Sequence, residues 1–489
     1  MKAVAVAAAL GLMTIAVVRG TFAVGGSDSS CYALMADALA HGRVQPIFPL
    51  AALAPWPDAL RTFAPGGFIP SPLRATAASP VCAPGFSLLM APFAWVARDG
   101  IFLVTPIAAA ALVWCVFLVG RHLGGPLAGT LASVLTATSP IVLFQAMQPM
   151  NDIATAALWI GVLAAATREE QARSWTMGAL TGIATLVRPN LAPLALVAAV
   201  FAPNIRFMSA AAPGVIIAAM LNWVLYGHPA RLGYGSAGDF FGTANVAANV
   251  TQYGNAWLET QTPFALLALA APFVVARDRR LVWMGLAMAM TTIVIYLFYQ
   301  PFPEWWYLRF LLPAVIISTM FAAVSAVALL QRPIVVTVAA AALSLFGVQT
   351  AATRQVFELQ RLESRFRHTG DYVRQKLPAT AIFYSVFDSG SIRFHADREA
   401  VLWDSLDPAW LDRAINWSRS QQREPFIVLE RFEEASFRAR FDGASPLGAL
   451  DWPPRAEIDR QVRIYAPADR EAYLAGRPVP TEYVFATDK

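Results

Sequence analysis

The sequence predicts a polytopic α-helical membrane protein with about eleven transmembrane helices, interfacial helices in its first outer loop and a small C-terminal soluble α/β domain. Of its 489 residues, 57% are hydrophobic and only 14% are charged, and its mean hydropathy is +0.50. Ordinary globular domains carry about 25% charged residues. Apolar runs near twenty residues long recur along the first part of the chain, and a helix of that length crosses the roughly 30 Å of hydrocarbon in a bilayer.

The expected spans are apolar runs bounded by charged residues, glycine or proline. The first run resembles a signal peptide, but it lacks a small-residue cleavage site, so we expect it to be retained as the first helix. The eleven candidate spans begin near Ala3, Gly100, Pro126, Asp152, Ser174, Leu191, Phe207, Thr262, Leu281, Arg309 and Ile334.

Residues 81–97 are apolar, but the run is short and is interrupted by Pro84 and Pro92. Cytoplasmic loops of membrane proteins carry an excess of Lys and Arg. If residues 81–97 do not cross, the basic segment 277–280 lies on the same side as Lys2, so we interpret 81–97 as re-entrant or interfacial rather than spanning. The arginines that then share the cytoplasmic side are Arg121, Arg168, Arg173, Arg206 and Arg332. The segments that then face outward are residues 25–99, residues 227–261 and everything after Ala352.

The composition changes at about Thr353, where charged residues become frequent. This change divides the chain into a transmembrane domain, residues 1–352, and an extracytoplasmic domain, residues 353–489. Short β-type runs, "AIFYSVF" from Ala381, "PFIVLE" from Pro425 and "VRIYAP" from Val462, alternate with helical patterns such as the one that starts at Pro408. This alternation predicts a small α/β unit. The unit contains no glycine-rich phosphate-binding loop.

The three cysteines, Cys31, Cys82 and Cys115, are too few and too scattered for a disulfide framework or a zinc site. Cys31 and Cys82 would share one outer loop, where they form either a disulfide or two buried thiols. Basic side chains occur singly between apolar runs, which is typical of topology signals and predicts no nucleic-acid partner.

Charged residues recur at the expected outer ends of several spans, while the span interiors carry almost none. After Asp28, apolar residues follow at helical spacing, which predicts an amphipathic helix at the outer interface with Asp28 at its N-terminus. One interpretation is that Asp28 serves merely as a helix cap and takes no part in any chemistry. Ionisable groups at membrane depth are costly and usually serve a site, although arginines can also snorkel to the interface and Asp152 can cap its helix. The other charges at this face are Arg19, Asp152, Arg188, Glu304 and Arg309.

Aromatic residues gather at the same face. Trp305, Trp306 and Tyr307 stand in one row, and Tyr32 follows Asp28 by four residues. Either they form the belt of aromatic residues common at membrane interfaces, or they line a site for a sugar or lipid. We count Arg19, Tyr32, Glu304 and this row as candidate substrate-lining residues. The aromatic residues of the next outer loop are Tyr226, Tyr234, Tyr253 and Trp257.

Four segments in fixed order carry a resemblance. These are "GGSDSSCYALMADALAHG" from Gly25, "LFQAMQPMND" from Leu143, "GIATLVRPNLAP" from Gly182 and "WWYLRFLLPA" from Trp305. Over residues 1–352 the chain resembles the C-type (GT-C fold) membrane glycosyltransferases, in the branch that contains protein mannosyltransferases and the aminoarabinose transferase of lipid A. The resemblance implies transfer of one sugar, with inversion, from a polyprenyl-phosphate donor to a lipid, glycan or protein acceptor outside the cytoplasm. It also implies an integral protein of the bacterial cytoplasmic membrane whose active site faces outward.

The resemblance assigns roles to four residues. Asp28 matches the catalytic acid of the first outer loop, and Asp152 matches an assisting acid after the third span. Arg188 and Arg309 match arginines that hold the donor phosphate. Many family members have two adjacent acids at the first position, whereas Ser29 follows Asp28 here. A hard divalent cation wants several oxygen ligands, so a divalent metal stays an open alternative that the ligand count does not support, and we predict no other cofactor.

Other functions are consistent with a polytopic apolar chain. A flippase, polymerase or ligase of lipid-linked glycans would share the phosphate-binding arginines but would move a whole glycan. A secondary transporter would show repeated halves and charges near the bilayer midplane. A non-catalytic sensor would use residues 353–489 as its receptor and would not need Asp28.

Overall fold

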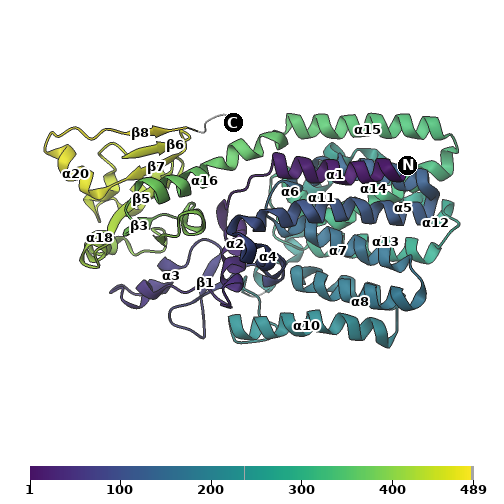
Figure 1. Ribbon diagram of the computed structural model, residues 1–489, viewed down its shortest axis with the longest axis horizontal. Helices are drawn as coiled ribbons and strands as arrows, with labels where there is room; N and C mark the ends of the chain where they lie inside the picture. The colour runs from purple at the N-terminus through teal and green to yellow at the C-terminus, as the bar shows by residue number, and fades with distance from the viewer. Residues whose placement is uncertain (236, 486–489) are drawn as a thin grey trace.

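The computed structural model describes residues 1–235 and 237–485. A bundle of helices and a smaller unit built on a β-sheet lie at opposite ends of an elongated molecule, with a layer of short elements between them (Figure 1). The helices of the bundle are α1 (Lys2–Val18), α5 (Val104–Ala137), α6 (Pro140–Ala146), α7 (Asn151–Ala166), α8 (Glu170–Val187), α9 (Pro193–Phe201), α10 (Ile205–Tyr226), α11 (Val246–Gln261), α12 (Ala271–Val274), α13 (Arg279–Leu297), α14 (Leu312–Leu330) and α15 (Pro333–Thr353). Three 3₁₀ segments adjoin them: η3 (Pro189–Leu191), η6 (Pro263–Ala270) and η7 (Trp305–Leu311).

Five helical segments of the described chain are long and apolar enough to cross a membrane, and six if the pair α6 and α7, bent by 117°, counts as one span. These are features of a polytopic membrane protein. The longest segment reverses direction at Gly125, whose φ is 82°, and across the two arms Ser133 Oγ donates a hydrogen bond to the Val113 carbonyl at 3.3 Å. The two spans expected near Gly100 and Pro126 are therefore two antiparallel arms. The full count of eleven stays a prediction.

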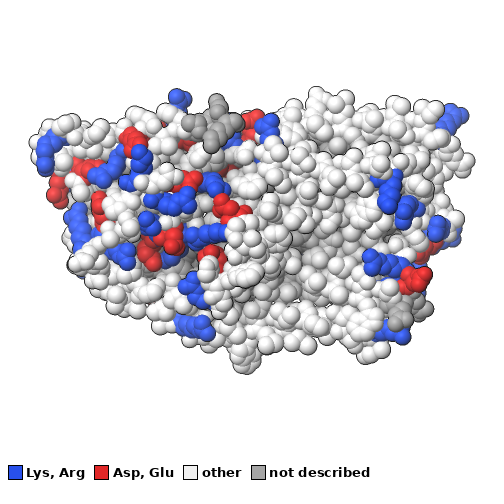
Figure 2. Space-filling view, viewed as in Figure 1, with Lys and Arg blue, Asp and Glu red and all other residues white. Residues whose placement is uncertain are grey.

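Charged side chains are segregated along the molecule. On the face seen in Figure 2, the middle of the bundle shows almost no charge, and Lys and Arg gather at the end that holds the N-terminus. Over the sheet unit, both signs of charge alternate. This distribution agrees with the expectation that the basic connections share one side of the membrane.

The layer between the bundle and the sheet contains α2 (Gly26–Ala40), α3 (Ala59–Phe63), α4 (Pro84–Val96) and an antiparallel pair, β1 (Phe68–Pro70) and β2 (Ala78–Pro80). At 1.5 Å per residue, the 13 residues of α4 span about 20 Å, which is less than the hydrocarbon thickness. This length agrees with a segment that does not cross the bilayer.

Helix α2 forms as predicted, but it is more buried than an amphipathic helix at the interface was expected to be. It is not amphipathic in its surroundings, because nearly every residue from Ser29 to Ala38 is buried. The sheet unit covers the face that the sequence left for solvent. Gly390 packs so tightly on α2 that a Cβ there would lie 2.1 Å from Ser30 Oγ.

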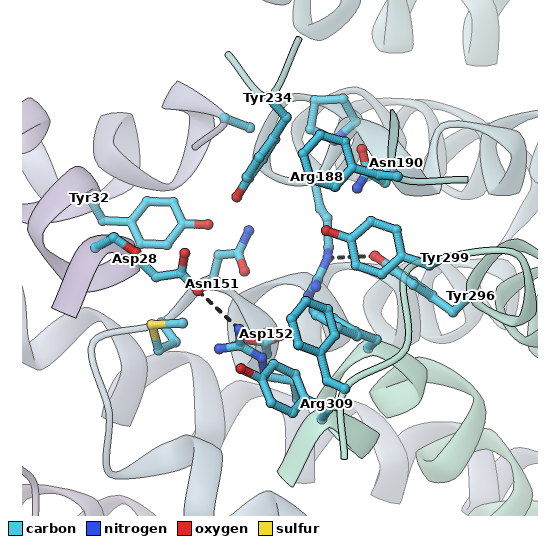
Figure 3. Close-up of a pocket in the computed structure, with 18 residues that line it drawn as sticks. Asp28, Tyr32, Asn151, Asp152, Arg188, Asn190, Tyr234, Tyr296, Tyr299 and Arg309 are labelled. Atoms are coloured by element: carbon cyan, nitrogen blue, oxygen red, sulfur yellow. Dashed lines mark hydrogen bonds and ion pairs between the residues drawn. The ribbon is translucent and has the colours of Figure 1, made fainter. Parts of the chain in front are cut away.

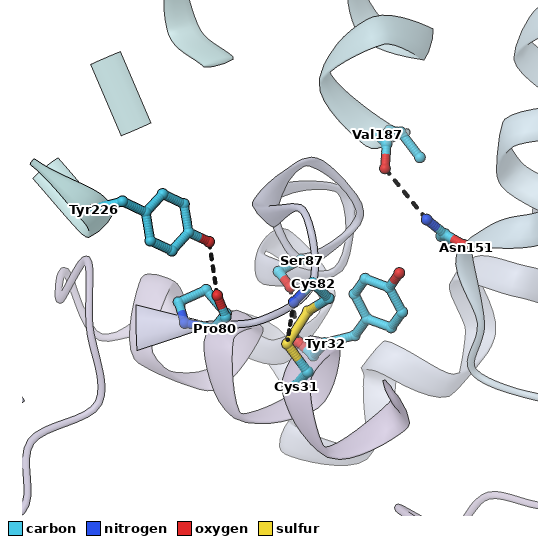
Figure 4. The surroundings of a disulfide bond; sticks show 8 residues. All are labelled: Cys31, Tyr32, Pro80, Cys82, Ser87, Asn151, Val187 and Tyr226. Carbon is cyan, nitrogen blue, oxygen red and sulfur yellow. Dashed lines mark hydrogen bonds between the residues drawn. A yellow bond between two sulfur atoms is a disulfide. The ribbon is translucent and has the colours of Figure 1, made fainter. Parts of the chain in front are cut away.

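A disulfide joins α2 to the segment before α4 (Figure 4). Cys31 and Cys82 are bonded, with their Cα atoms 6.1 Å apart, and this settles the two alternatives that the sequence left open. Beside the bond, Ser87 Oγ donates to the Tyr32 carbonyl at 3.0 Å. Cys115 is free. The disulfide and this hydrogen bond hold the start of α2 against α4.

The C-terminal unit starts with α16 (Leu359–Lys376) and continues into a six-stranded mixed sheet. The three predicted β-type runs form β3, β5 and β7, and the predicted helix forms α18 (Leu411–Ser420). Strand β3 pairs in parallel with β4 and β5, and β7 pairs antiparallel with β5 and β6. In order across the sheet, the strands are β4 (Glu399–Val401), β3 (Ala381–Tyr384), β5 (Glu424–Glu430), β7 (Val462–Tyr465), β6 (Ala456–Ile458) and β8 (Glu482–Val484). The division of the chain at residue 352 and the side of the membrane that this unit occupies stay predictions.

Candidate active site

A cavity of about 290 Å³ lies at the end of the bundle next to α2 (Figure 3). It brings together α2, the start of α7, the segment after α8, the loop that contains Tyr234, the end of α13 and η7. Figure 3 shows the hydroxyl groups of Tyr32 and Tyr234 pointing into it. Its lining residues are Ser27, Asp28, Tyr32, Ala83, Met150, Asn151, Asp152, Arg188, Pro189, Asn190, Tyr234, Phe240, Tyr296, Tyr299, Phe302, Tyr307, Arg309 and Phe310.

Asp28 lies in the first turn of α2, and 40% of its side chain is exposed. It makes no capping hydrogen bond, since Gly25 is the cap residue of α2 and no side chain caps that end. Instead, Asp28 Oδ2 accepts a hydrogen bond from Arg309 Nη2 at 3.0 Å. The interpretation of Asp28 as only a helix cap is therefore wrong.

Asp152 lies in the first turn of α7 and is 1% exposed. It does not cap its helix. Its Oδ1 accepts a hydrogen bond from Arg188 Nη1, and its Oδ2 lies 3.9 Å from Arg309 Nη1. A buried carboxylate is stable only when it is paired, and here two arginines from distant segments supply the pairing.

The two arginines are held by aromatic residues as well as by carboxylates. Arg188 Nε donates to the Tyr296 hydroxyl at 2.9 Å, and the Arg188 guanidinium lies 5.4 Å from the ring centre of Phe310. The Arg309 guanidinium lies 5.2 Å from the centre of the same ring. Arg309 Nε is buried without a hydrogen-bond partner in the described structure. Such a donor is costly unless a ligand uses it.

The four charged side chains therefore alternate in sign: Asp28, Arg309, Asp152, Arg188. Asn151 holds the middle of this row of charges in place. Its Nδ2 donates to the Val187 carbonyl at 3.3 Å, which ties the start of α7 to the end of α8 (Figure 4). The result is a rigid pair of guanidinium groups with a half-exposed carboxylate at one end. Guanidinium groups fixed in this way are suited to bind phosphate.

A second cavity, of about 500 Å³, lies on the other side of Asp28 and Arg309. It extends from the α6–α7 turn and η7 to the end of α15 and the start of α16. Both cavities share Ser27, Asp28, Met150, Tyr307 and Arg309. The ion pair between Asp28 and Arg309 therefore stands at the boundary between two spaces.

An apolar groove of about 450 Å³ adjoins the first cavity on its other side. The groove and the first cavity share Pro189, Asn190, Tyr234, Phe240 and Tyr299. Beyond them, the groove is lined by Pro193, Ala230, Leu232, Gly235, Phe241, Val294, Ile295 and Phe298. It runs alongside α13, one of the helices long enough to span a membrane.

The candidate lining residues from the sequence divide into two groups. Tyr32 lines the first cavity, Trp306 lines the second, and Tyr307 lines both. Arg19 and Glu304 are exposed and line neither cavity. Trp305 also lines neither, because its ring packs on Phe144 with centroids 5.2 Å apart and lies under the Arg354 guanidinium.

Sequence reasoning did not identify Tyr296, Tyr299, Phe310, Asn151 or Asn190 as part of the site. Tyr296 and Tyr299 lie three residues apart at the end of a predicted span, a spacing that puts both on one face of a helix. Each asparagine directly neighbours a predicted site residue or its motif. These signals are weak, because aromatic and amide residues at span ends are common.

The described residues of the site lack the ligands that a metal ion needs. Within residues 1–235 and 237–485, no three His, Cys, Asp or Glu side chains lie close enough together to hold a metal ion. The two carboxylates of the site each bind an arginine. A divalent cation such as Mg²⁺ or Ca²⁺ prefers six or more oxygen ligands, so these residues do not fit one.

The sequence matches no known protein-family model and no curated protein. Among solved structures, the chain is similar to ArnT from Cupriavidus metallidurans bound to undecaprenyl phosphate. The TM-score is 0.56 at 11% identity, covering 89% of this chain and 94% of ArnT. It is also similar to the oligosaccharyltransferase AglB from Archaeoglobus fulgidus in complex with an inhibitory peptide and a dolichol-phosphate. There the TM-score is 0.55 at 13% identity, covering 92% of this chain and 72% of AglB. The chain has the GT-C fold that the resemblance implied.

Proposed function

We propose that this protein is a membrane glycosyltransferase that moves one sugar, with inversion, from a polyprenyl-phosphate donor to an acceptor outside the cytoplasm. The observation that carries the proposal is the boundary between the two cavities. One half-exposed carboxylate and one guanidinium stand there, and a second guanidinium lies in the cavity next to an apolar groove. The two similar structures are complexes with undecaprenyl phosphate and with a dolichol-phosphate, which supports a lipid-phosphate donor.

The apolar groove and the first cavity together suit such a donor. The polyprenyl chain lies in the groove along α13, and its phosphate meets Arg188 and Arg309. The sugar occupies the first cavity among Tyr32, Tyr234 and Tyr299. Ligand pockets usually measure roughly 300–1,000 Å³, and the cavity, at about 290 Å³, is at the small end of that range. This size favours one sugar over a whole glycan, and so favours a single-sugar transferase over a flippase, polymerase or ligase.

The chemistry follows from the pairing of Asp28 with Arg309. A donor phosphate that binds Arg309 competes with Asp28 for the same guanidinium, so donor binding frees the Asp28 carboxylate. Asp28 then accepts the proton of an acceptor hydroxyl while that oxygen attacks the anomeric carbon. The bond between the anomeric carbon and the phosphate oxygen breaks, and polyprenyl phosphate leaves with the electron pair. The arginines stabilise the charge of the leaving phosphate.

Asp152 is a positioning residue in this scheme. Its contacts are to both arginines rather than to Asp28, so its role is to fix the guanidinium groups at the spacing that the phosphate needs. The resemblance implied an assisting acid at this position, and in this scheme Asp152 assists through the two arginines.

Two observations support a site outside the cytoplasm. Disulfides persist in oxidising compartments, and Cys31 and Cys82 are bonded within the layer that carries Asp28. The basic end of the bundle is the opposite end, where the N-terminus lies (Figure 2). A bacterial cytoplasmic membrane with the site and the C-terminal unit facing outward fits both. A secondary transporter fits less well, since its binding site would lie near the bilayer midplane.

The first prediction tests Asp28 as the general base. In protein reconstituted into liposomes, undecaprenyl-phosphate-linked hexoses, pentoses and aminosugars are offered in turn, with water as the acceptor, and release of undecaprenyl phosphate is measured. General-base assistance is worth about 10²- to 10⁴-fold, so Asp28→Asn should slow release by that order at unchanged protein abundance. Asp58→Asn is the matched control, because Asp58 is an exposed acid of the same outer layer. Native rates in Asp28→Asn would contradict the assignment, and so would an absence of turnover with every donor class.

A further inference from the structure

The second cavity differs in chemistry from both the first cavity and the groove. Its walls carry three side-chain amides, from Gln145, Gln148 and Gln355, and hydroxyls from Thr21, Ser27 and Ser29. Neutral hydrogen-bonding groups of this kind pair equally well with donors and acceptors. The cavity therefore suits a ligand with many neutral polar groups.

One of these amides has an oxygen without a hydrogen-bond partner in the described structure. Gln145 is 1% exposed, and its Oε1 is buried without a hydrogen-bond partner in the described structure. A buried acceptor left without a hydrogen bond costs about 1–3 kcal/mol. Because Gln145 lines the cavity, a ligand hydroxyl can supply the missing hydrogen bond.

Aromatic rings form part of the wall. Phe144 and Trp306 stack with their centroids 5.9 Å apart and their planes inclined by 16°, and Tyr307 lies beside them. Flat apolar faces next to amides are the combination that a sugar ring needs, since it has apolar C–H faces and a polar rim.

The charged side chains of the wall form ion pairs with other side chains of the protein. Besides Asp28 and Arg309, the lining contains Arg354 and Glu363. Arg354 pairs with Glu259 at 2.5 Å, and Glu363 lies 3.6 Å from Arg365 Nη1. In the proposed function Arg309 binds the donor phosphate, and Arg354 is already paired, so this wall offers a phosphate-bearing acceptor no further cationic side chain among its described residues.

The lining residues come from helices and from the segments that connect them. A peptide that binds by adding a strand to a sheet edge therefore finds no edge here. Part of the wall belongs to α16, which begins the C-terminal unit (Figure 1), so the cavity lies between the bundle and that unit.

We infer that the second cavity binds the acceptor and that the acceptor is a neutral saccharide. The inference rests on the proposed function for its chemistry. The acceptor hydroxyl reaches Asp28 from the second cavity while the donor sugar reaches the same boundary from the first. The new bond joins the acceptor oxygen to the anomeric carbon, the proton passes to Asp28, and the bond to the donor phosphate breaks. The two partners thus meet from opposite sides, as inversion requires.

Two variants test the cavity. Gln148→Ala removes one neutral hydrogen-bonding group, worth about 0.5–1.5 kcal/mol, so the KM for the acceptor should rise roughly twofold to tenfold. Trp306→Ala removes a stacking face and should raise it at least as much. In both, the rate of donor hydrolysis by water, measured without acceptor, should match the native protein. Gln360→Ala is the matched control, because Gln360 lies on the exposed side of α16 and lines neither cavity.

The probes are neutral tetrasaccharides of glucose, galactose, mannose and rhamnose, a serine-containing peptide, and phosphorylated lipid A. Full-length protein in nanodiscs receives each probe, with and without the active donor. Ligand-observed NMR measures saccharide binding independently of turnover. Binding of a neutral tetrasaccharide that is weakened by Gln148→Ala and Trp306→Ala, and its glycosylation when donor is present, support the inference.

Two different failures separate the two proposals. Donor turnover without binding of any neutral saccharide, or transfer only to the peptide or to lipid A, overturns the inference and leaves the proposed function standing. Saccharide binding that depends on Trp306, without turnover of any donor, overturns the proposed function and leaves the saccharide site standing. Binding that is unchanged in both variants overturns the assignment of the second cavity.

Discussion

Asp152 contacts both arginines of the site, and this explains how two cations stay at one end of an apolar bundle. Removing one partner of a buried ion pair costs about 3–5 kcal/mol, so each member depends on the others. Arg309 is the member that faces both cavities. Its Nε has no partner in the described structure, which leaves one N–H for a ligand. In the proposed function, this N–H binds the donor phosphate.

The prediction at this scale concerns donor affinity. Hydrogen bonds to charged groups are worth about 1.5–3 kcal/mol, so Arg309→Ala should weaken donor binding roughly tenfold to a hundredfold. Arg309→Lys should rescue little of this, because an ammonium cannot reproduce the planar fork of a guanidinium. Donor affinity is measured by titrating undecaprenyl phosphate against the protein in detergent. Arg43→Ala, an exposed arginine of the same layer, is the control. Equal affinity in Arg309→Ala would rule out the phosphate contact.

At the scale of elements, the disulfide is what fixes α2 to α4. The two cysteines are 51 residues apart in sequence, and a disulfide closing a loop of that size typically stabilises a protein by about 2–4 kcal/mol. Asp28 lies one helical turn before Cys31. The position of the carboxylate thus depends on a covalent bond outside the site.

The next prediction follows from this bond. Cys31→Ser with Cys82→Ser should lower the unfolding temperature and the transfer rate, and reductant should do the same to the native protein. Cys115→Ser should leave the sensitivity to reductant unchanged, since Cys115 is free. Thiol counting after denaturation without reductant should find one reactive thiol in the native chain. Three reactive thiols would show that the bond does not form.

A buried acid in the sheet unit predicts a pH dependence. Burial raises the pKa of Glu433 to about 7, and the charges of Glu430 and Asp404 add to this effect. A raised carboxyl pKa means that ionisation opposes folding, so this group's contribution to stability is lost as the pH rises from about 4.5 to about 7. Asp388 and Glu430, whose pKa values are also raised by burial, act in the same direction.

The measurement is the unfolding temperature of the full-length protein at pH 5 and pH 8. Glu433→Gln should reduce the difference between the two temperatures relative to the native protein, mainly by raising stability at pH 8. Glu471→Gln, at an exposed position of α20 (Pro467–Leu474), should leave the difference unchanged. An equal difference in the native protein and Glu433→Gln would contradict the buried charge.

At the scale of the whole molecule, the C-terminal unit holds the linker that leads into α2. The buried His395 Nε2 accepts a hydrogen bond from the Val24 backbone N–H at 3.1 Å. Arg367 Nη1 donates to the Phe22 carbonyl at 3.1 Å. Burial, together with the charge of Arg367, lowers the pKa of His395 to about 3. The ring is therefore neutral near pH 7 and able to accept, and its contribution to stability declines as the pH falls from 6.5 toward 3.

The last prediction tests this contact between the two parts. His395→Leu leaves the Val24 N–H unpaired, which should destabilise the linker by about 1–3 kcal/mol. His395→Gln keeps an acceptor at nearly the same place. Hydrogen exchange of residues 20–28 at pH 7 should therefore quicken in His395→Leu and change little in His395→Gln, and transfer should slow in the same order. Equal exchange in the two variants would mean that the hydrogen bond does not hold the linker.

Much of the architecture could be predicted from the sequence, because hydropathy and periodicity are local properties. The apolar runs gave the helices of the bundle, and the β-type runs gave β3, β5 and β7. The site was predicted less completely. Asp28, Asp152, Arg188 and Arg309 stood out because charge is rare in this chain, whereas Tyr296 and Tyr299 did not, because aromatic residues are common at span ends.

By itself, the sequence determined that this chain spans a membrane, that an α/β unit follows and that a few charges stand at one end of the bundle. The tertiary structure alone decided that Arg309 pairs with Asp28 across 281 residues, that α2 is buried and that two cavities meet at this pair. The physical reason is range. Hydrophobic period is set by neighbours in the chain, while burial and the pairing of charges depend on which distant segments pack together.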